Sequence, residues 1–288
     1  RLLLVGMGLG AILALMQSFL PPLLVLWFTR LLEGVSQLAV VVAAPTLIIQ
    51  YTEPRHRSIT MGLWSTFVSV AFVLTSAGGG WLLQRFHLAG LLLAHSVGMA
   101  VMCLLVWVTV PEDHDSRPPW PAWSKLPSLH IQLYGHWSTS LPGLCFFCYT
   151  CCAIAMFTFL PHYAGKSSQW LAPVLPLFTI VGTFSAGWLA QSLMKPDRLV
   201  LLAFGGVALA GLYLCFSLMT RSNVVAAPIM LMFMLGVAAG SAFALVPYLN
   251  DTTMAQARAT GAVAQLGNLG STLGTPLVTV CISMLGGP

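Results

Sequence analysis

The sequence predicts an all-α fold, a polytopic bundle of helices that crosses a lipid bilayer many times. Nine apolar stretches, each long enough to cross, fill almost all of the 288 residues. A hydrocarbon core of about 30 Å needs roughly 20 helical residues. Only 7% of the residues are charged and 58% are hydrophobic, against about 25% charged in an ordinary soluble domain. Because backbone groups in lipid must be hydrogen bonded within their own segment, we expect helices and not strands.

Short polar segments that contain helix breakers separate the expected spans. Examples are Pro21-Pro22, Glu53-Pro54 and Asn250-Asp251. The nine spans are expected at residues 2–19, 24–50, 58–83, 89–110, 141–160, 170–190, 199–219, 225–249 and 260–284.

The basic residues predict the orientation, because Lys and Arg concentrate in cytoplasmic loops. With Arg1 on the cytoplasmic side, eight basic residues lie inside and three outside, while Arg30 lies within a span. The inside set is Arg1, Arg55, Arg57, Arg117, Lys125, Lys195, Arg198 and Arg258, and the outside set is Arg85, Lys166 and Arg221. The basic residues are scattered singly over loops, which argues against a nucleic-acid partner.

The longest polar connection divides the chain into two bundles. We expect an N-terminal bundle at 1–110, a cytoplasmic linker at 111–140 and a C-terminal bundle at 141–288. Within the linker, residues 128–137 alternate apolar and polar side chains and contain Tyr134 and Trp137. This pattern is compatible with a short helix that lies in the membrane interface.

Arg30 and Glu33 are the first candidates for a functional site. They are the only ionisable side chains of the span 24–50, and their spacing of three residues places them on one helical face. A charge at membrane depth costs at least about 2.5 kcal/mol, so such residues usually line a cavity or pair with each other. The competing interpretation is that the pair lies near the outer boundary and snorkels, or holds two helices together.

The segment Arg30-Leu-Leu-Glu33-Gly34 resembles the fourth-helix signature of the major facilitator superfamily. The basic segment at residues 53–57 and the glycine-rich Gly78-Gly79-Gly80-Trp81 resemble the loop and helix that follow in that family. Gly187-Trp-Leu-Ala-Gln191, followed by Lys195, resembles a weakened copy of the family's Gly-x-Leu-Ala-Asp loop. The resemblance implies alternating access between two bundles that rock around a cavity near the bilayer midplane.

The same resemblance assigns the spans to nine of twelve family helices. The first bundle resembles helices 3 to 6 and the second resembles helices 7 to 11, so we expect a fragment that lacks helices one, two and twelve. Proton-driven drug exporters of the family carry Gly-Pro where this chain has Thr75-Ser76. Ala43-Ala44-Pro45 and Gly62-Leu-Trp64 look more like the permeases for cyanate, nitroimidazole and similar solutes.

Other polar residues within the spans are candidates for solute binding or coupling. Gln37, which precedes Leu38, follows Glu33 by one helical turn. His95 could relay a proton, although a lone His is more often satisfied by a backbone carbonyl. Gln265 and Asn268 share a stripe on the last span, where amides either bond to a neighbouring helix or line the solute path.

Glycines within the spans are expected to let helices approach closely, because helices in lipid associate through small residues. Such close approach also permits rocking movements between helices. We assign packing or gating roles to Gly34, Gly62, Gly79, Gly80, Gly236, Gly240, Gly270 and Gly274.

No catalytic or nucleotide-binding motif is found in the sequence. Seven cysteines lie within or beside apolar spans, where Cys serves as a small apolar residue, and we expect neither a metal nor a cofactor. We therefore expect no enzyme but a secondary transporter of a small polar or anionic solute, driven by an ion gradient. A proton-coupled multidrug exporter, a scaffold or receptor that moves nothing, and a redox enzyme built on the cysteines stay open as alternatives.

The expected partners are the solute, protons as a coupling ion and the lipid bilayer. We expect a monomer in the inner membrane of a bacterium.

Overall fold

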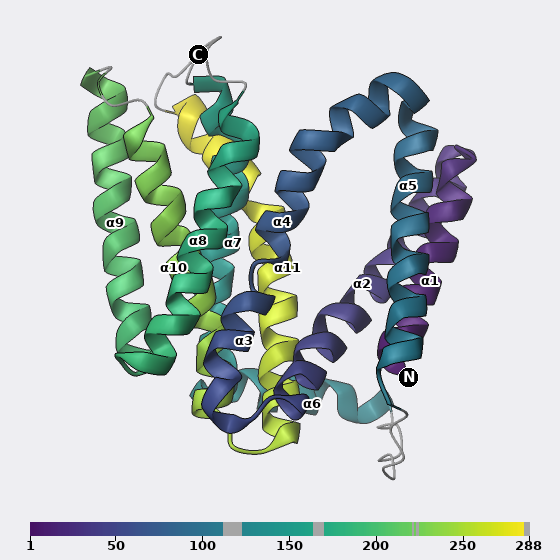
Figure 1. The fold of residues 1–288 in the computed structure, drawn as a ribbon, viewed down its shortest axis with the longest axis horizontal. Helices are drawn as coiled ribbons and strands as arrows, with labels where there is room; N and C mark the ends of the chain where they lie inside the picture. Colours follow the sequence, from purple (N-terminus) through teal and green to yellow (C-terminus); the bar gives the residue numbers. More distant parts are fainter. Residues whose placement is uncertain (112–122, 164–169, 221, 223–224, 285–288) are drawn as a thin grey trace. The chain divides into compact units, whose positions relative to one another are not determined.

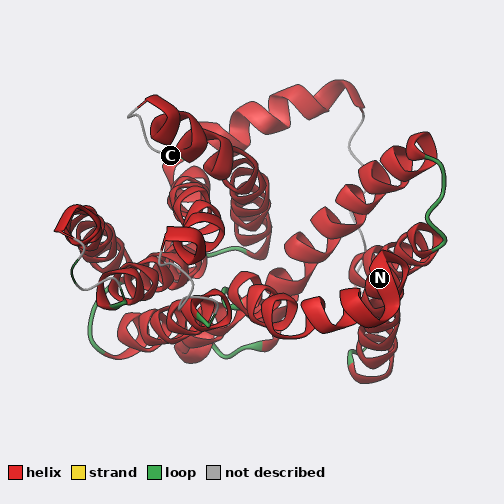
Figure 2. Ribbon diagram, turned by 90° about the horizontal axis from the view of Figure 1, so that it is seen from above, coloured by secondary structure: helices red, strands yellow, loops and turns green. Residues whose placement is uncertain are grey.

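The computed structural model describes residues 1–111, 123–163, 170–220, 222 and 225–284. The described residues are almost entirely helical and contain no strand (Figures 1 and 2), which confirms the predicted all-α class. The α-helices are α1 (Leu2–Ser18), α2 (Leu23–Tyr51), α3 (Arg57–Trp64), α4 (Phe67–Leu74), α5 (Gly80–Thr109), α6 (Leu126–Gly135), α7 (Trp137–Tyr163), α8 (Leu171–Ser192), α9 (Pro196–Thr220), α10 (Ala226–Leu249) and α11 (Thr253–Met284). The predicted loop residues Arg117, Lys166 and Arg221 lie outside the described part of the chain, as does the linker segment 112–122.

Six stretches of the described residues are helices long and apolar enough to cross a membrane. They are Leu23–Tyr51, Pro54–Thr109, Trp137–Pro161, Leu171–Ser192, Pro196–Thr220 and Ala226–Leu249, and the shorter apolar helix Leu2–Ser18 precedes them. The stretch Pro54–Thr109 contains two of the spans that the sequence predicts. The remaining span lies in α11, which is long but more polar because it carries Arg258, Gln265 and Asn268.

The predicted span at 58–83 is not one regular helix. It is divided into α3, α4 and a π-helical segment, Thr75–Gly79. Between α3 and α4, Ser65 Oγ donates to the carbonyl of Gly62 at 2.9 Å, and Thr66 Oγ1 donates to that of Leu63 at 2.8 Å. Hydroxyl side chains that bond to the preceding turn compete with the regular backbone ladder and bend helices.

The predicted loop at residues 84–88 lies inside α5. His87 has a φ of 58° and a ψ of −169°, so α5 is two helical parts joined across a kink at this residue. The segment contains polar residues but no Pro, and helix-compatible residues continue on both sides. The boundary between the two predicted spans is therefore present as a kink and not as an extended loop.

The chain forms two compact units. The first consists of residues 1–44 and 77–131, and the second of residues 45–76 and 132–288. Two of the three internal boundaries coincide with irregular helix, and the third falls within α6 between residues 131 and 132. One of the two falls at Pro45 within α2, where proline removes a backbone hydrogen bond, and the other falls in the π-helical segment.

In the first unit, α1 packs beside the second helical part of α5 (Figure 1). The buried hydroxyl of Ser96 in α5 donates to the carbonyl of Ala11 in α1 at 2.7 Å. The buried hydroxyl of Ser36 in α2 donates to the carbonyl of Gly6 at 2.6 Å. Hydroxyl-to-carbonyl bonds of this kind hold helices together where apolar burial provides no driving force.

The most extensive helix contacts of the second unit are those of α7 with α11 and of α8 with α10, and α9 also packs on α10. A Cβ placed on Gly236 or Gly240 would overlap the carbonyl oxygens of Thr179 and Thr183, respectively. Its core contains the fully buried side chains of Tyr149 and Phe243. These contacts leave α10 as the most enclosed helix of the unit, which agrees with the long buried run in its C-terminal half.

Candidate functional site

Glu33 is the centre of a polar cluster in the first unit. Its Oε2 accepts a hydrogen bond from an Nη1 of Arg30 at 2.8 Å and another from Nε2 of Gln17 at 3.0 Å. The Glu33 side chain is 17% exposed, whereas that of Arg30 is 50% exposed. The carboxylate is therefore largely enclosed by protein, while its cation partner is half exposed.

His95 contributes a third helix to this cluster. Its Nε2 lies 3.5 Å from Oε1 of Glu33, and its side chain is half exposed. When protonated, the imidazole would be a second cation beside the carboxylate. The structure thus brings together three residues that the sequence singled out, from helices α2 and α5, and adds Gln17 from α1.

The depth of the pair in α2 can be judged from its position along the helix. Arg30 is the eighth residue of α2 and Glu33 the eleventh. At 1.5 Å per residue, Glu33 lies about 15 Å from the start of the helix, roughly half the thickness of a hydrocarbon core. Arg30 lies about 10 Å along the same helix. A long Arg side chain can snorkel from that depth, but the carboxylate of Glu33 cannot reach as far.

The path of α1 places Gln17 against Glu33. Gly6, Gly10, Ala14 and Gln17 recur at intervals of three or four residues, and all four are buried. Residues at this spacing share one helical face. Small residues on that face allow close approach, as a Cβ on Gly10 would lie only 2.7 Å from Oγ of Ser36. The same face then presents the Gln17 amide to the carboxylate.

Gln17 is the member of the cluster that sequence reasoning missed. It is fully buried, and its Oε1 has no hydrogen-bond partner among the described residues. A buried amide oxygen without a partner costs about 1–3 kcal/mol. Stability alone therefore does not explain the presence of Gln17 at this position. The available signal was an amide that continues a stripe of small residues in an otherwise apolar run.

The other predicted polar residues make no described hydrogen bond or ion pair with this cluster. Gln37 is exposed on α2. Gln265 is partly buried, and its Oε1 accepts a hydrogen bond from the hydroxyl of Tyr134 in α6 at 2.7 Å. Asn268 is exposed on α11. Of the two alternatives for the α11 amides, Gln265 thus bonds to a neighbouring helix.

The predicted glycines fall into two groups. Gly62, Gly236, Gly240, Gly270 and Gly274 lie so close to a neighbouring helix that a Cβ would overlap its atoms, mostly backbone. For Gly62 the contact is Cα of Gly187 at 2.7 Å. In contrast, a Cβ on Gly34 or Gly80 would meet nothing within 4 Å, while Gly79 is buried at the end of the π-helical segment.

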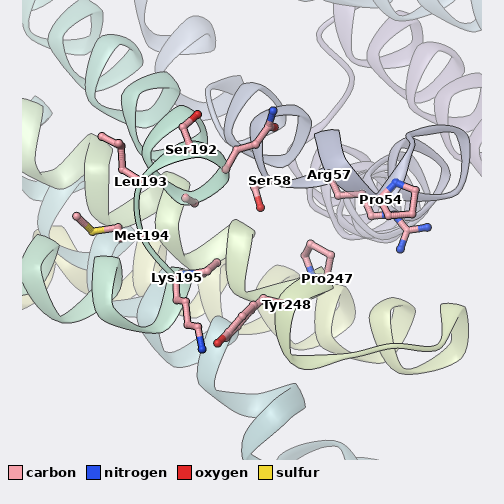
Figure 3. A pocket seen from close by; sticks show the side chains of 12 residues that line it. Pro54, Arg57, Ser58, Ser192, Leu193, Met194, Lys195, Pro247 and Tyr248 are labelled. Atoms are coloured by element: carbon pink, nitrogen blue, oxygen red, sulfur yellow. The ribbon is translucent and has the colours of Figure 1, made fainter.

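A separate pocket of about 580 Å³ lies in the second unit. It is formed by the start of α3, the turn between α8 and α9, and the end of α10 (Figure 3). Arg57 and Lys195 are the charged residues that line it. The turn is the one that resembles the weakened family loop, and Gln191 on this turn lies 3.3 Å from Nδ1 of His56.

The cysteines provide no ligand cluster within the described residues. No group of three His, Cys, Asp or Glu side chains that could hold a metal is found there. Cys145 is buried and Cys148 and Cys152 are exposed on α7, where a thiol serves as a small apolar residue.

The long apolar helices and their small-residue contacts define a multi-pass integral membrane protein. The sequence of residues 1–275 matches the family described as the Major Facilitator Superfamily, and the chain belongs to this family of secondary transporters. No curated protein matches the sequence. The chain is similar in fold to a variant of the E. coli fucose:proton symporter FucP, with a TM-score of 0.71 and 14% identity over 99% of this chain and 76% of that one.

Proposed function

We propose that the protein moves a small polar or anionic solute across the membrane by alternating access, driven by an ion gradient. The observation that carries this proposal is the Arg30–Glu33 pair within a membrane helix, bonded to Gln17 and next to His95. Ionisable residues at membrane depth mark solute and ion pathways in such proteins. The moving parts would be the two bundles that the sequence predicts at 1–110 and 141–288, although residues 45–76 of the first belong to the second compact unit of the structure.

Arg30 is the group best suited to meet a solute. Its guanidinium is half exposed and has five N–H donors, of which the structure engages Nη1 with Glu33. A planar fork of donors suits carboxylates and other small anions. The segments Ala43-Ala44-Pro45 and Gly62-Leu-Trp64 resemble the cyanate and nitroimidazole permeases, so the solutes of that group are the first to test.

Glu33 is the group best suited to couple the solute to protons. It accepts two hydrogen bonds from two helices, so adding a proton to it removes the charge that holds Arg30 and weakens both bonds. That change would release Arg30 for the solute and bias the bundles toward one opening. His95 would hold a proton close to Glu33 in the same cycle. The fucose:proton symporter of similar fold supports a proton as the coupling ion.

The test is solute flux with the purified full-length protein in proteoliposomes. Radiolabelled cyanate, 2-nitroimidazole and L-fucose are offered with and without an imposed pH gradient. We expect accumulation of one small polar solute that the gradient increases and a protonophore abolishes. Flux that no gradient alters would overturn the coupling, and a protein that binds a solute without moving it would be a receptor instead.

We expect a monomer in the inner membrane of a bacterium.

A further inference from the structure

The pocket of the second unit is lined by two cations, Arg57 and Lys195. Its volume of about 580 Å³ lies within the usual range of ligand pockets, about 300–1,000 Å³. Arg57 comes from the start of α3 and Lys195 from the turn before α9, and Figure 3 shows them on opposite sides of the pocket. None of its lining residues belongs to the Glu33 cluster.

The two cations of the pocket have no described anionic partner. No described Asp or Glu lies within 4.0 Å of Arg57 or Lys195, and no carboxylate lines the pocket. Of the nearest acidic residues in sequence, Glu53 pairs with Arg55 at 2.7 Å and Asp197 accepts the backbone N–H of Arg198 at 2.9 Å.

Arg57 is also free to bind. Its Nε makes a long contact of 3.4 Å to the carbonyl of Thr52, which leaves the four N–H groups of the guanidinium tip without a described partner. The residue is only partly exposed, so its charge is less screened than that of a loop arginine.

Neutral donors complete the lining. Ser58, Ser192 and Tyr248, which carry hydroxyl groups, line the same pocket as the two cations. Hydroxyls together with Arg and Lys are the side chains that bind phosphate oxygens. A carboxylate solute would need fewer donors than this set provides, whereas a phosphate has three or four acceptor oxygens.

The predicted topology places Arg57 and Lys195 at the cytoplasmic ends of their helices. The cytoplasmic leaflet carries the anionic lipids, whose phosphates lie at the level of such helix ends. We propose that this pocket binds the phosphate of an anionic lipid headgroup. The competing interpretation is that both cations serve only to set the orientation of the chain, in which case they would bind no phosphate in the folded protein.

The test uses the purified full-length protein in a neutral detergent and isothermal titration calorimetry. The probes are short-chain phosphatidylglycerol, short-chain phosphatidylcholine and inorganic phosphate. One Lys or Arg near an anionic surface contributes about fivefold in affinity, so the double variant Arg57→Gln/Lys195→Gln should bind phosphatidylglycerol about 25-fold more weakly. Arg55→Gln is the matched control, because Arg55 lies two residues from Arg57 but pairs with Glu53 and does not line the pocket.

Each outcome is decisive once thermal denaturation shows that the variants are folded. Phosphatidylglycerol binding that is stronger than phosphatidylcholine binding, and that the double variant loses while Arg55→Gln keeps it, supports the proposal. Inorganic phosphate that binds as well as the lipid would overturn the lipid as the source, and equal losses in the double variant and the control would overturn the site itself. Solute flux is measured separately, so failure here leaves the transport proposal standing.

Discussion

The exchange Gln17→Glu tests whether the amide of α1 meets Glu33 as the structure shows. It replaces the Nε2 donor, 3.0 Å from Oε2 of Glu33, by a carboxylate oxygen with almost no change in shape. Two unit charges 3.0 Å apart repel by about 5.5 kcal/mol at an effective dielectric constant of 20. Protonating an ordinary glutamate carboxyl at pH 7 costs about 4 kcal/mol, so the pair is expected to share a proton instead.

The sign of the pH dependence follows from this proton. The folded variant holds a proton that the unfolded chain releases above about pH 4.3, so its stability falls as the pH rises. We expect the free energy of unfolding to fall by about 4 kcal/mol at pH 7 and by about 1 kcal/mol at pH 5. The positive charge of Arg30 reduces both losses. In thermal denaturation the midpoint at pH 7 should be roughly 8 to 16 °C below that of the unmodified protein, and the gap should narrow at pH 5.

Gln50→Glu is the matched control. Gln50 is exposed near the end of α2 and has no described hydrogen bond, so the same chemical exchange there should change stability by less than about 0.5 kcal/mol. The reasoning is refuted if Gln17→Glu is no more destabilising than Gln50→Glu, or if its loss is the same at both pH values.

Two further predictions concern the second unit. Gly236→Ala should destabilise the protein by about 1–3 kcal/mol, because a Cβ there overlaps the Thr179 carbonyl. Gly211→Ala should stabilise it by about 0.5–1 kcal/mol, because a Cβ there meets nothing within 4 Å. Thermal denaturation measures both changes. Tyr134 is 38% exposed, and the partial desolvation of its ring raises the pKa of the phenol above its ordinary value of 10.0. The ultraviolet difference between the protein and Tyr134→Phe should therefore titrate above pH 10. A phenol that ionises at or below pH 10 would contradict the partial desolvation of Tyr134, whose hydroxyl bonds to Gln265.

The sequence predicts the helical class and most span boundaries because lipid leaves the backbone few alternatives. Hydrophobic length decides where a helix can cross, and short polar turns decide where it ends. The break after Trp64 was missed because it depends on side-chain hydroxyls of Ser65 and Thr66 that bond to the preceding turn. The predicted boundary at residues 84–88 is present as the kink at His87, where the backbone leaves the helical conformation without an extended loop.

The site was predictable in part for the same reason. Arg30 and Glu33 lie three residues apart on one helix, and local spacing alone brings them together. The approach of His95 and Gln17 depends on how α5 and α1 pack, which no spacing along α2 reveals. Gln17 shows why the sequence alone is not sufficient. A single amide near the end of an apolar run is equally typical of the polar residues that flank a turn.

Solute flux in the variant Arg30→Ala tests the central claim most directly. Arg85→Ala is the control, because it removes an exposed arginine from α5 that makes no described ion pair. With equal amounts of both variants inserted in proteoliposomes, the account predicts that Arg30→Ala abolishes flux of the transported solute while Arg85→Ala retains it. Flux by Arg30→Ala at the rate of the unmodified protein would contradict the claim that the Arg30–Glu33 pair meets the solute.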